Sequence, residues 1–395
     1  MRKIELLAPA GNLEKAKIAL LYGADAVYIG GKQFSLRARA SNFDLKEIKE
    51  LVEFAHERNK LVYVTMNIIP HDSDLAGLKE YLINLETIGV DAIIVSSLYI
   101  IEQAKLWAPK LAVHLSTQKS TTSVNSVKYY QNKGVERVVL AREVTLEEMT
   151  YISKNTEIEL EVFIHGGMCA SYSGHCVLSN HMTNRDANRG GCAHSCRWNY
   201  SLVKNGEKQE KFFNFGSKDL MAIKYIPQLI DLGIASLKIE GRMKSMYYLA
   251  CVVRAYRMLI DHYIEFGSVS EEYYQFIDSE IRKAENRLTN VGFYNGIPDV
   301  DGQLYDNRSE IPTQEFAGFV LGNVEEYALI EQRNYFIVGD TLEVISPNME
   351  NRRFKVEKMF DYETKESLDV ARHPLQKILI ECPFSLKPND FIRKV

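Results

Sequence analysis

The stretch LKEYLINLETIGVDAIIVSS, residues 78–97, contains one complete helix-to-strand unit. Leu78–Ile88 has the apolar spacing of an amphipathic helix, and Ala92–Val95 is the short apolar run of a buried strand. Gly89 stands just past the helix, where a left-handed backbone favours glycine. The same order of helix, glycine, two residues and strand recurs around three further glycines: Gly23, Gly134 and Gly233. These four repeats predict a βα array.

Eight apolar runs precede residue 243, and each is a candidate strand. They are residues 4–8, 26–29, 61–66, 92–95, 111–115, 137–140, 158–164 and 236–239. Eight βα units in about 250 residues match the size of a TIM barrel. The alternative is a doubly wound open sheet, but no G-x-G-x-x-G follows the first strand. We therefore predict an α/β fold, a TIM (β/α)8-like barrel over residues 1–290, closed by helices within 245–290.

Polar residues follow the predicted strand ends, where a TIM barrel keeps its chemistry. The candidates for substrate binding are the basic residues Arg37, Arg39, Arg142, Lys238, Arg242 and Lys244. Arginine binds carboxylates and phosphates through paired hydrogen bonds, so a barrel mouth lined with these basic residues suits a dicarboxylate or an RNA backbone. The alternative is a set of structural ion pairs with Glu143 and Glu240. The candidate catalytic residues are His165, Gln118 and Glu240, with the histidine as acid or base.

Four of the six cysteines fall within 28 residues, as Cys169, Cys176, Cys192 and Cys196 in the spacing C-x6-C-x15-C-x3-C. Four thiols can hold an iron–sulfur cluster or a zinc ion. The alternatives to a metal or cluster site are unrelated buried thiols, or two disulfides. The N-terminus does not read as a signal peptide and no run approaches a membrane span, so we expect a cytoplasmic protein with reduced thiols. The absence of C-x2-C pairs favours a cluster over zinc.

The cysteines lie in a long segment after the seventh strand, residues 166–216, which we predict to be a functional insertion. Within it, residues 202–214 predict a hairpin that turns at Asn205-Gly206. Residues 291–312 read as a linker. Residues 313–395 predict a small all-β barrel domain, with strands at 319–321, 328–331, 336–338, 341–345, 354–358 and 377–381. The net charge of −4 argues against a generally basic nucleic-acid binder but allows a local basic patch.

Residues 161–179, EVFIHGGMCASYSGHCVLS, closely resemble the signature of the collagenase-like peptidase family U32, except at Gly167, where serine or alanine is usual. The resemblance extends over nearly the whole chain. It continues through residues 7–11, 38–43, 189–192, 196–198, 217–219 and 238–244.

The resemblance implies a TIM barrel whose cysteines bind a four-iron four-sulfur cluster. Members of the family resemble hydroxylation factors for tRNA, ribosomal RNA or ubiquinone precursors. Those acting on tRNA make 5-hydroxyuridine at the wobble position and depend on prephenate. Many members also carry a cysteine where this chain has Met221. If the family's cluster uses that cysteine, Cys196 must replace it here or the cluster is incomplete.

We therefore expect an RNA-modifying enzyme that hydroxylates tRNA wobble uridine, with prephenate as donor and an iron–sulfur cluster, or zinc as the alternative metal. Its expected partner is the tRNA anticodon loop, which Arg185, Arg189, Trp198 and Tyr200 are candidates to contact. Homo- and hetero-oligomers are both compatible with the sequence. The alternatives are a collagenase-like peptidase and a non-catalytic, cluster-bearing RNA-binding protein. The chain lacks H-E-x-x-H and G-x-S-x-G motifs, which disfavours the peptidase.

Overall fold

Eight parallel strands close into a barrel in the computed structural model, which describes residues 4–36, 42–284, 287–304, 315–347 and 350–395. The strands are β1 (Glu5–Pro9), β2 (Ala26–Gly30), β3 (Leu61–Met66), β4 (Ala92–Val95), β5 (Ala112–Leu115), β6 (Arg137–Val139), β7 (Glu159–Gly166) and β11 (Ser236–Ile239). β11 pairs in parallel with both β1 and β7, which closes the barrel. All eight predicted strands are confirmed, within two residues at either end.

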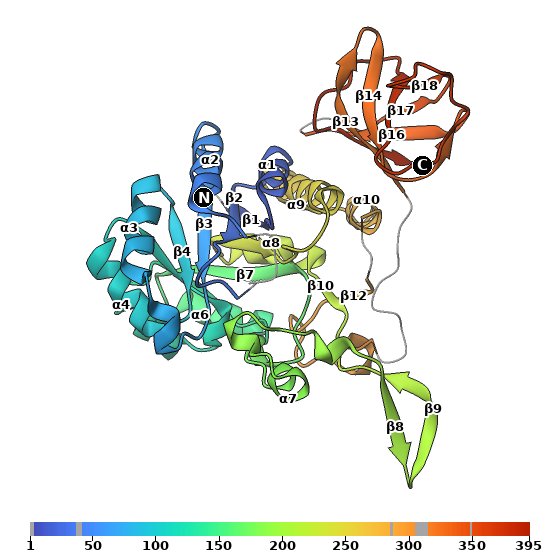
Figure 1. Cartoon of the computed structure of the whole chain (residues 1–395). Helices are drawn as coiled ribbons and strands as arrows, with labels where there is room; N and C mark the ends of the chain where they lie inside the picture. Colours follow the sequence, from blue (N-terminus) through green and yellow to red (C-terminus); the bar gives the residue numbers. More distant parts are fainter. Residues whose placement is uncertain (1–3, 37–41, 285–286, 305–314, 348–349) are drawn as a thin grey trace.

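Helices cover the outside of the barrel, as Figure 1 shows. They are α1 (Leu13–Leu21), α2 (Leu45–His56), α3 (Leu78–Ile88), α4 (Leu98–Trp107), α5 (Val124–Gln131), α6 (Leu146–Lys154), α8 (Ile226–Asp231) and α9 (Met246–Phe266). Local sequence fixes their ends. Asp44 and Glu47 form a reciprocal capping box at the start of α2, and Gly89 ends α3 with a φ of 89°.

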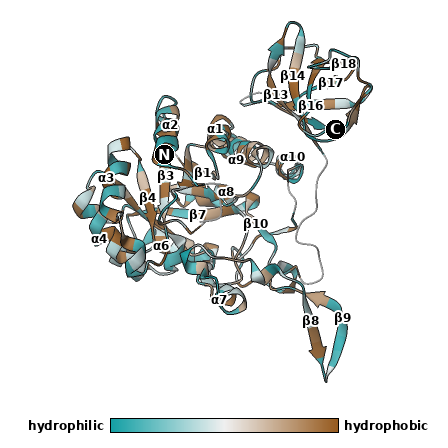
Figure 2. Ribbon diagram, viewed as in Figure 1, coloured by the Kyte–Doolittle hydropathy of each residue, from teal (hydrophilic) through white to brown (hydrophobic). Residues whose placement is uncertain are grey.

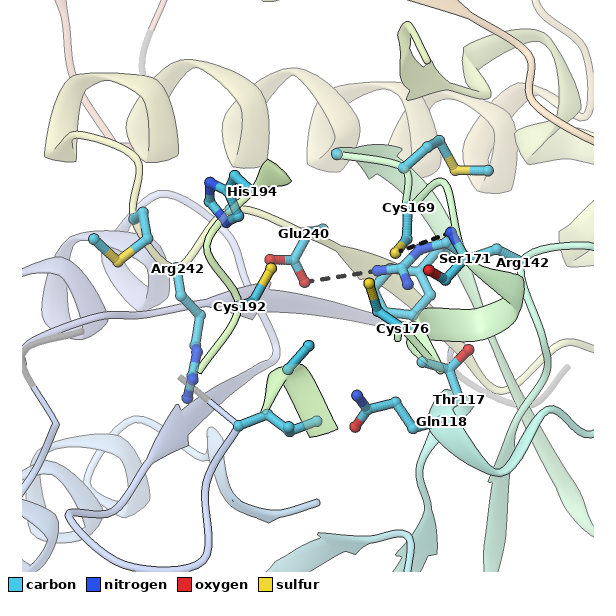
Figure 3. Close-up of a pocket in the computed structure, with 18 of the residues that line it drawn as sticks. Thr117, Gln118, Arg142, Cys169, Ser171, Cys176, Cys192, His194, Glu240 and Arg242 are labelled. Atoms are coloured by element: carbon cyan, nitrogen blue, oxygen red, sulfur yellow. Dashed lines mark hydrogen bonds and ion pairs between the residues drawn. The ribbon is translucent and has the colours of Figure 1, made fainter. Parts of the chain in front are cut away.

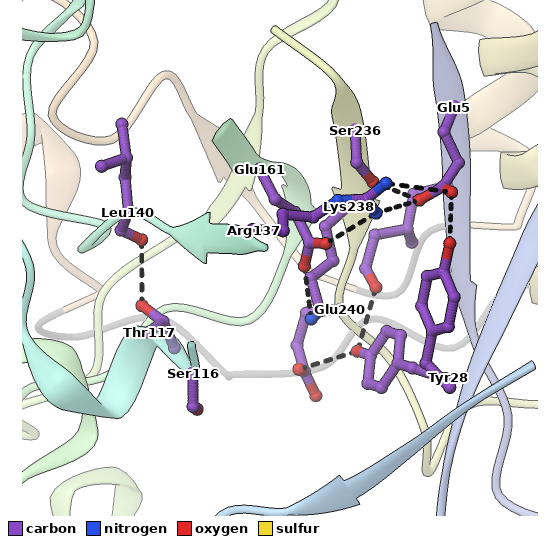
Figure 4. Close-up of polar contacts among 12 residues, drawn as sticks. Glu5, Tyr28, Ser116, Thr117, Arg137, Leu140, Glu161, Ser236, Lys238 and Glu240 are labelled. Atoms are coloured by element: carbon purple, nitrogen blue, oxygen red, sulfur yellow. Dashed lines mark hydrogen bonds and ion pairs between the residues drawn. The ribbon is translucent and has the colours of Figure 1, made fainter. Parts of the chain in front are cut away.

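Charged residues fill the end of the barrel interior where the strands begin (Figure 4). Arg137 Nη1 lies 2.7 Å from Glu5 Oε1 and 3.4 Å from Glu161 Oε2. Lys238 Nζ lies 2.7 Å from the other oxygen of Glu161, whose side chain is fully buried. The Tyr63 hydroxyl donates to Glu5. We call Glu5, Tyr63, Arg137, Glu161 and Lys238 the interior network.

Two further short strands extend the barrel sheet beyond β7. β10 (Asp219–Met221) pairs antiparallel with β7, and β12 (Thr289–Asn290) pairs parallel with β10. The sequence analysis did not predict either strand, since two or three residues give no readable periodicity. Between β7 and β10 lies the insertion, which contains α7 (Leu178–Thr183) and a hairpin of β8 (Tyr200–Lys204) and β9 (Glu207–Phe213).

The hairpin turns at Asn205-Gly206, as predicted. Both turn residues have a positive φ, 53° and 84°, which this pair of residues tolerates. Figure 1 shows the hairpin projecting away from the barrel, and Figure 2 shows that β8 is mainly hydrophobic and β9 mainly hydrophilic. Leu202, Val203 and Phe212 are exposed on it.

The C-terminal domain is a separate antiparallel β half-barrel. Its main sheet has the order β17-β16-β21-β13-β14-β20-β18. These strands are β13 (Phe316–Val324), β14 (Tyr327–Gln332), β16 (Thr341–Ile345), β17 (Arg352–Lys355), β18 (Met359–Asp361), β20 (Lys377–Glu381) and β21 (Phe391–Lys394); β15 (Phe336–Ile337) pairs separately with β19 (Val370–Ala371). Strands β18, β19 and β21 were not predicted from the sequence. Residues 305–314, which include part of the predicted linker and the 312/313 boundary, lie outside the described residues.

The two domains meet in a well-packed interface. The ring of Tyr247 on α9 stacks on Phe316 with 4.6 Å between centroids. The Tyr22 hydroxyl donates to the carbonyl of Ile345 at 2.9 Å. The buried Arg393 guanidinium pairs with Glu280 on α10 (Glu271–Arg282) at 2.8 Å. These contacts hold the half-barrel on the outer helices, and the barrel mouth has no part in them.

Across the described ranges, no helix combines the length and the apolar character that crossing a membrane requires.

Candidate functional site

A cavity of about 530 Å³ opens at the C-terminal ends of the barrel strands (Figure 3). Its wall combines barrel residues with residues of the insertion. The barrel contributes Tyr28, Thr65, Asn67, Ser116, Gln118, Arg142, Phe163, Lys238, Glu240, Arg242 and Lys244, and the insertion contributes all four clustered cysteines. The structure therefore brings together most of the residues that the sequence analysis named.

Arg142 and Glu240 form the centre of the polar wall. Arg142 Nη2 lies 3.7 Å from Glu240 Oε2, and its guanidinium carbon lies 3.8 Å above the centroid of the Phe163 ring. Stacking on an aromatic face fixes the plane of the guanidinium. Glu240 also accepts a hydrogen bond from the Tyr28 hydroxyl at 3.1 Å. The carboxylate and the guanidinium are thus both held in place at the cavity wall.

Arg242 is buried beside the cavity, where its guanidinium donates to two hydroxyls. The distances are 3.2 Å from Nη2 to Ser35 Oγ and 3.3 Å from Nη1 to Thr65 Oγ1. A Cβ at Gly30 would lie 2.2 Å from Arg242 Nη1, so any other residue there would force the guanidinium out of this position. This explains a glycine directly at the end of β2.

The other predicted basic residues differ in their surroundings. Lys238 lines the cavity, but its ammonium pairs with Glu161 in the interior network and lies 4.4 Å from the Tyr28 ring centroid. Lys244 lies 4.8 Å from the ring centroid of Tyr248 at the mouth. Arg37 and Arg39, also predicted to bind substrate, lie outside the described residues.

His165 is buried at the end of β7 and is not among the described residues that line the cavity. Its Nδ1 lies 3.3 Å from the Tyr256 hydroxyl, and its ring packs against Tyr248. Burial lowers the pKa of His165 to about 3, with the charge of Lys244 adding to the effect. A neutral imidazole at this position supports packing, and its catalytic role stays a prediction.

All four clustered cysteines line the cavity. Cys169 and Cys192 are exposed, and Cys176 and Cys196 are half-buried. Burial raises the pKa of the Cys196 thiol, and the nearby Arg197 opposes this shift. Among the described residues, no three His, Cys, Asp or Glu side chains converge tightly enough to hold a single metal ion. The donor set, four thiols facing one cavity, fits the chemistry of a cluster site.

Met221 stands where the family resemblance led us to expect a further cysteine. It lies in β10, packed in the core of the barrel, and is absent from the described cavity lining. Cys196 instead reaches the cavity through the turn at Ser195–Arg197. The geometry therefore places Cys196 with the other three thiols.

Polar contacts hold the insertion over the barrel mouth. Arg189 forms a two-fold ion pair with Asp74, with distances of 2.7 and 2.8 Å. Glu143 accepts hydrogen bonds from the backbone and hydroxyl of Ser173. Arg189 was expected to contact RNA phosphates, but its guanidinium is engaged by Asp74 here.

Two arginines of the cavity wall were not predicted from the sequence as site residues. Arg197 lies in the stretch 196–198 of the family resemblance but was not named as a site residue, and Arg287 was not noted at all, although both line the cavity. Arg287 Nη1 lies 3.5 Å from Asp219 Oδ1. The signal available in the sequence was weak, because Arg287 follows α10, far from any predicted strand end.

Comparison with known proteins places these features in a family. The model of Peptidase family U32 matches residues 11–304, and that of the Peptidase family U32 C-terminal domain matches residues 312–393. The chain is 44% identical to a tRNA hydroxylation protein P1 of Bacillus subtilis, over 100% of this chain and 95% of that protein. It is 40% identical to the 23S rRNA 5-hydroxycytidine C2501 synthase of Escherichia coli, over 67% of this chain and 40% of that protein.

A further relative carries the name of a protease. The chain is 31% identical to a collagenase of Porphyromonas gingivalis, over 74% of this chain and 73% of that protein. Names within the family thus cover RNA hydroxylation and proteolysis. With both family models matched along nearly the whole sequence, the chain belongs to Peptidase family U32.

Proposed function

We propose that this protein hydroxylates RNA, and that its substrate is the wobble uridine of tRNA, which it converts to 5-hydroxyuridine with prephenate as co-substrate. The observation that carries the proposal is the composition of one cavity, where four thiols, a stacked arginine and a carboxylate face the same space. The relatives named for tRNA and rRNA hydroxylation support the reaction class.

The cationic wall suits a small dicarboxylate. Arg142 presents a guanidinium whose plane is set by Phe163, which prepares it for a two-point contact with a carboxylate. Arg242 and Lys244 add positive charge at the same mouth. A cavity of this volume also lies within the range that holds small-molecule ligands.

Cys169, Cys176, Cys192 and Cys196 would hold a four-iron four-sulfur cluster. The support is that all four line the same cavity, while Met221 is buried in the core. A four-iron cluster spaces its ligands more widely than a zinc ion does, which favours it over zinc. Such a cluster would supply an electron-accepting or Lewis-acidic centre at the barrel mouth.

Glu240 is the best-placed group to accept a proton. Its carboxylate lies at the cavity wall between Tyr28 and Arg142, both of which fix its position. A carboxylate that is held in place within reach of a bound substrate removes a proton from it by general base catalysis. Tyr28 and Arg142 then act as positioning residues for Glu240.

The anticodon loop would dock on the insertion. Residues 166–216 carry six basic and three acidic residues, whereas the whole chain has a net charge of −4. Arg185 lies on this segment, and Trp198 is exposed beside Arg197. Since phosphate contacts release counterions, tRNA binding should weaken as the salt concentration rises.

The test is nucleoside mass spectrometry of tRNA from a strain that lacks the gene, with the wild-type chain or Glu240→Gln returned to it. We expect 5-hydroxyuridine to return with the wild-type chain and to remain absent with Glu240→Gln. The same purified protein should be incubated with gelatin. Gelatin cleavage that Glu240→Gln abolishes, together with unchanged tRNA in the deletion strain, would contradict the proposal in favour of the peptidase.

A further inference from the structure

The end of β5 presents three consecutive polar residues, Ser116, Thr117 and Gln118, to the cavity. Two of them are committed to the fold. The Thr117 hydroxyl donates to the carbonyl of Leu140 at 3.1 Å, and the Ser116 hydroxyl accepts from the backbone N–H of Gln118 at 3.4 Å. Figure 3 shows the side chain of Gln118 extending its amide group into the cavity.

The amide oxygen of Gln118 is buried and has no hydrogen-bond partner. Among the described residues of the cavity wall, one other buried side-chain oxygen, Ser195 Oγ, has no hydrogen-bond partner. It adjoins the cysteine cluster. A buried acceptor without a donor is unfavourable, so its occurrence inside a cavity indicates a ligand that supplies the donor.

The carboxamide lies beside the insertion, since a Cβ at Gly174 would lie 3.3 Å from Gln118 Nε2. The backbone of Gln118 belongs to the turn Thr117–Lys119. A ligand that reaches the carboxamide meets one acceptor and one donor, side by side.

We propose that Gln118 is the residue that selects uracil, and this rests on the proposed function. Uracil offers the N3–H donor next to the O4 acceptor, which complements the oxygen and nitrogen of one carboxamide. Cytosine has an acceptor at N3 and a donor at N4, so it meets the same carboxamide with both groups reversed. Gln118 thereby determines specificity for the base and takes no part in the chemical step.

Glutamate at this position removes the distinction between the two bases. One carboxylate oxygen accepts from uracil N3–H or from the cytosine amino group, and the other oxygen then faces an acceptor in either case, O4 of uracil or N3 of cytosine. Gln118→Glu keeps the shape of the side chain, so it changes the hydrogen-bonding pattern more than the packing. Gln131→Glu, on the exposed end of α5, makes the same chemical change far from the cavity and serves as the matched control.

The experiment uses the purified full-length protein and two anticodon stem-loop RNAs that differ only in U or C at the target position. Binding is measured by fluorescence anisotropy and product by nucleoside mass spectrometry. Gln118→Glu should lower the preference for U over C by about tenfold to a hundredfold, the size of one bidentate base contact. Gln118→Ala should weaken binding of the U-containing RNA, and Gln131→Glu should match the wild type.

Prephenate affinity and iron content are measured on the same preparations, to show that the variants fold and keep the rest of the site. A Gln118→Glu protein that retains the wild-type preference for U would overturn this inference and leave the proposed function standing. A wild-type protein that neither binds nor modifies either RNA would overturn the proposed function, and this inference with it.

Discussion

The two ends of the barrel interior treat charge in opposite ways. At the end where the strands begin, the interior network pairs each carboxylate with a cation, and Glu161 is fully buried between Arg137 and Lys238. At the mouth, the Arg142–Glu240 pair is longer, at 3.7 Å, and Gln118 keeps a buried oxygen without a partner. The interior network is satisfied within the fold and supports the structure, whereas the unpartnered oxygen of Gln118 lies on the cavity wall, where a ligand can supply the donor.

The largest expected effect concerns the cysteines at the mouth. Cys176→Ser should abolish cluster binding and RNA hydroxylation, because the cluster needs a thiolate at each ligand position. Cys382→Ser, in the C-terminal domain, is the matched control and should keep both. Iron and sulfide analysis after anaerobic purification measures cluster binding. Equal iron content in the two variants would contradict the cluster assignment.

The next effect tests the interior network. Glu161→Gln removes the charge that faces both Lys238 and Arg137, and we expect a loss of about 3–5 kcal/mol in the free energy of unfolding. Glu159 pairs with the same arginine at 2.8 Å, but its side chain is 44% exposed. Glu159→Gln should therefore cost about 1 kcal/mol or less. Urea denaturation compares the two, and similar losses would show that burial does not separate them.

A smaller effect is expected for the anion site at the mouth. Arg142→Ala should weaken prephenate binding by about tenfold to a hundredfold, the range expected for one charge-assisted contact. Arg142→Lys keeps the charge but loses the planar stack on Phe163, so it should recover only part of the affinity. Arg58→Ala, in the turn after α2, controls for the general loss of positive charge. Calorimetry gives the affinities, and full affinity in Arg142→Ala would exclude this residue from the site.

Substitution of His165 should have the smallest effect on the free energy of unfolding at neutral pH. Because its pKa is about 3 when folded against about 6.5 when unfolded, the unfolded chain binds an extra proton between these values. The free energy of unfolding should therefore fall as the pH drops from 6.5 towards 3, by up to about 1.4 kcal/mol per pH unit from this group. Burial also lowers the pKa of His114, which acts in the same direction.

His165→Phe keeps an aromatic ring between Tyr248 and Tyr256 and removes the titrating group. Its unfolding free energy should depend less steeply on pH between 6 and 4 than that of the wild type, while His373→Phe at the exposed surface should follow the wild type. Parallel curves for wild type and His165→Phe would mean that the histidine is protonated in the folded protein.

Much of the fold could be predicted from the sequence because its determinants are local. Eight apolar runs define the strands, four of them preceded by a glycine that ends a helix, and the capping box at Asp44 and the left-handed Gly89 define helix ends. The clustering of four cysteines in residues 169–196 also marked one region of the chain as a candidate site. In the half-barrel the prediction was weaker, since strands of two or three residues such as β18 and β19 carry too short a pattern.

The roles of individual side chains were decided by the tertiary structure. Lys238 and Glu161 are 77 residues apart in the sequence, and Arg242 and Ser35 are 207 apart, yet each pair is in hydrogen-bond contact. Local sequence places a residue at a strand end, but it does not determine which distant strand faces it or which way its side chain turns. The sequence by itself thus determined the barrel, its insertion and the four thiols. Only the packing of distant segments made Lys238 part of the interior network, engaged Arg189 with Asp74, and left the Gln118 oxygen without a partner in the cavity.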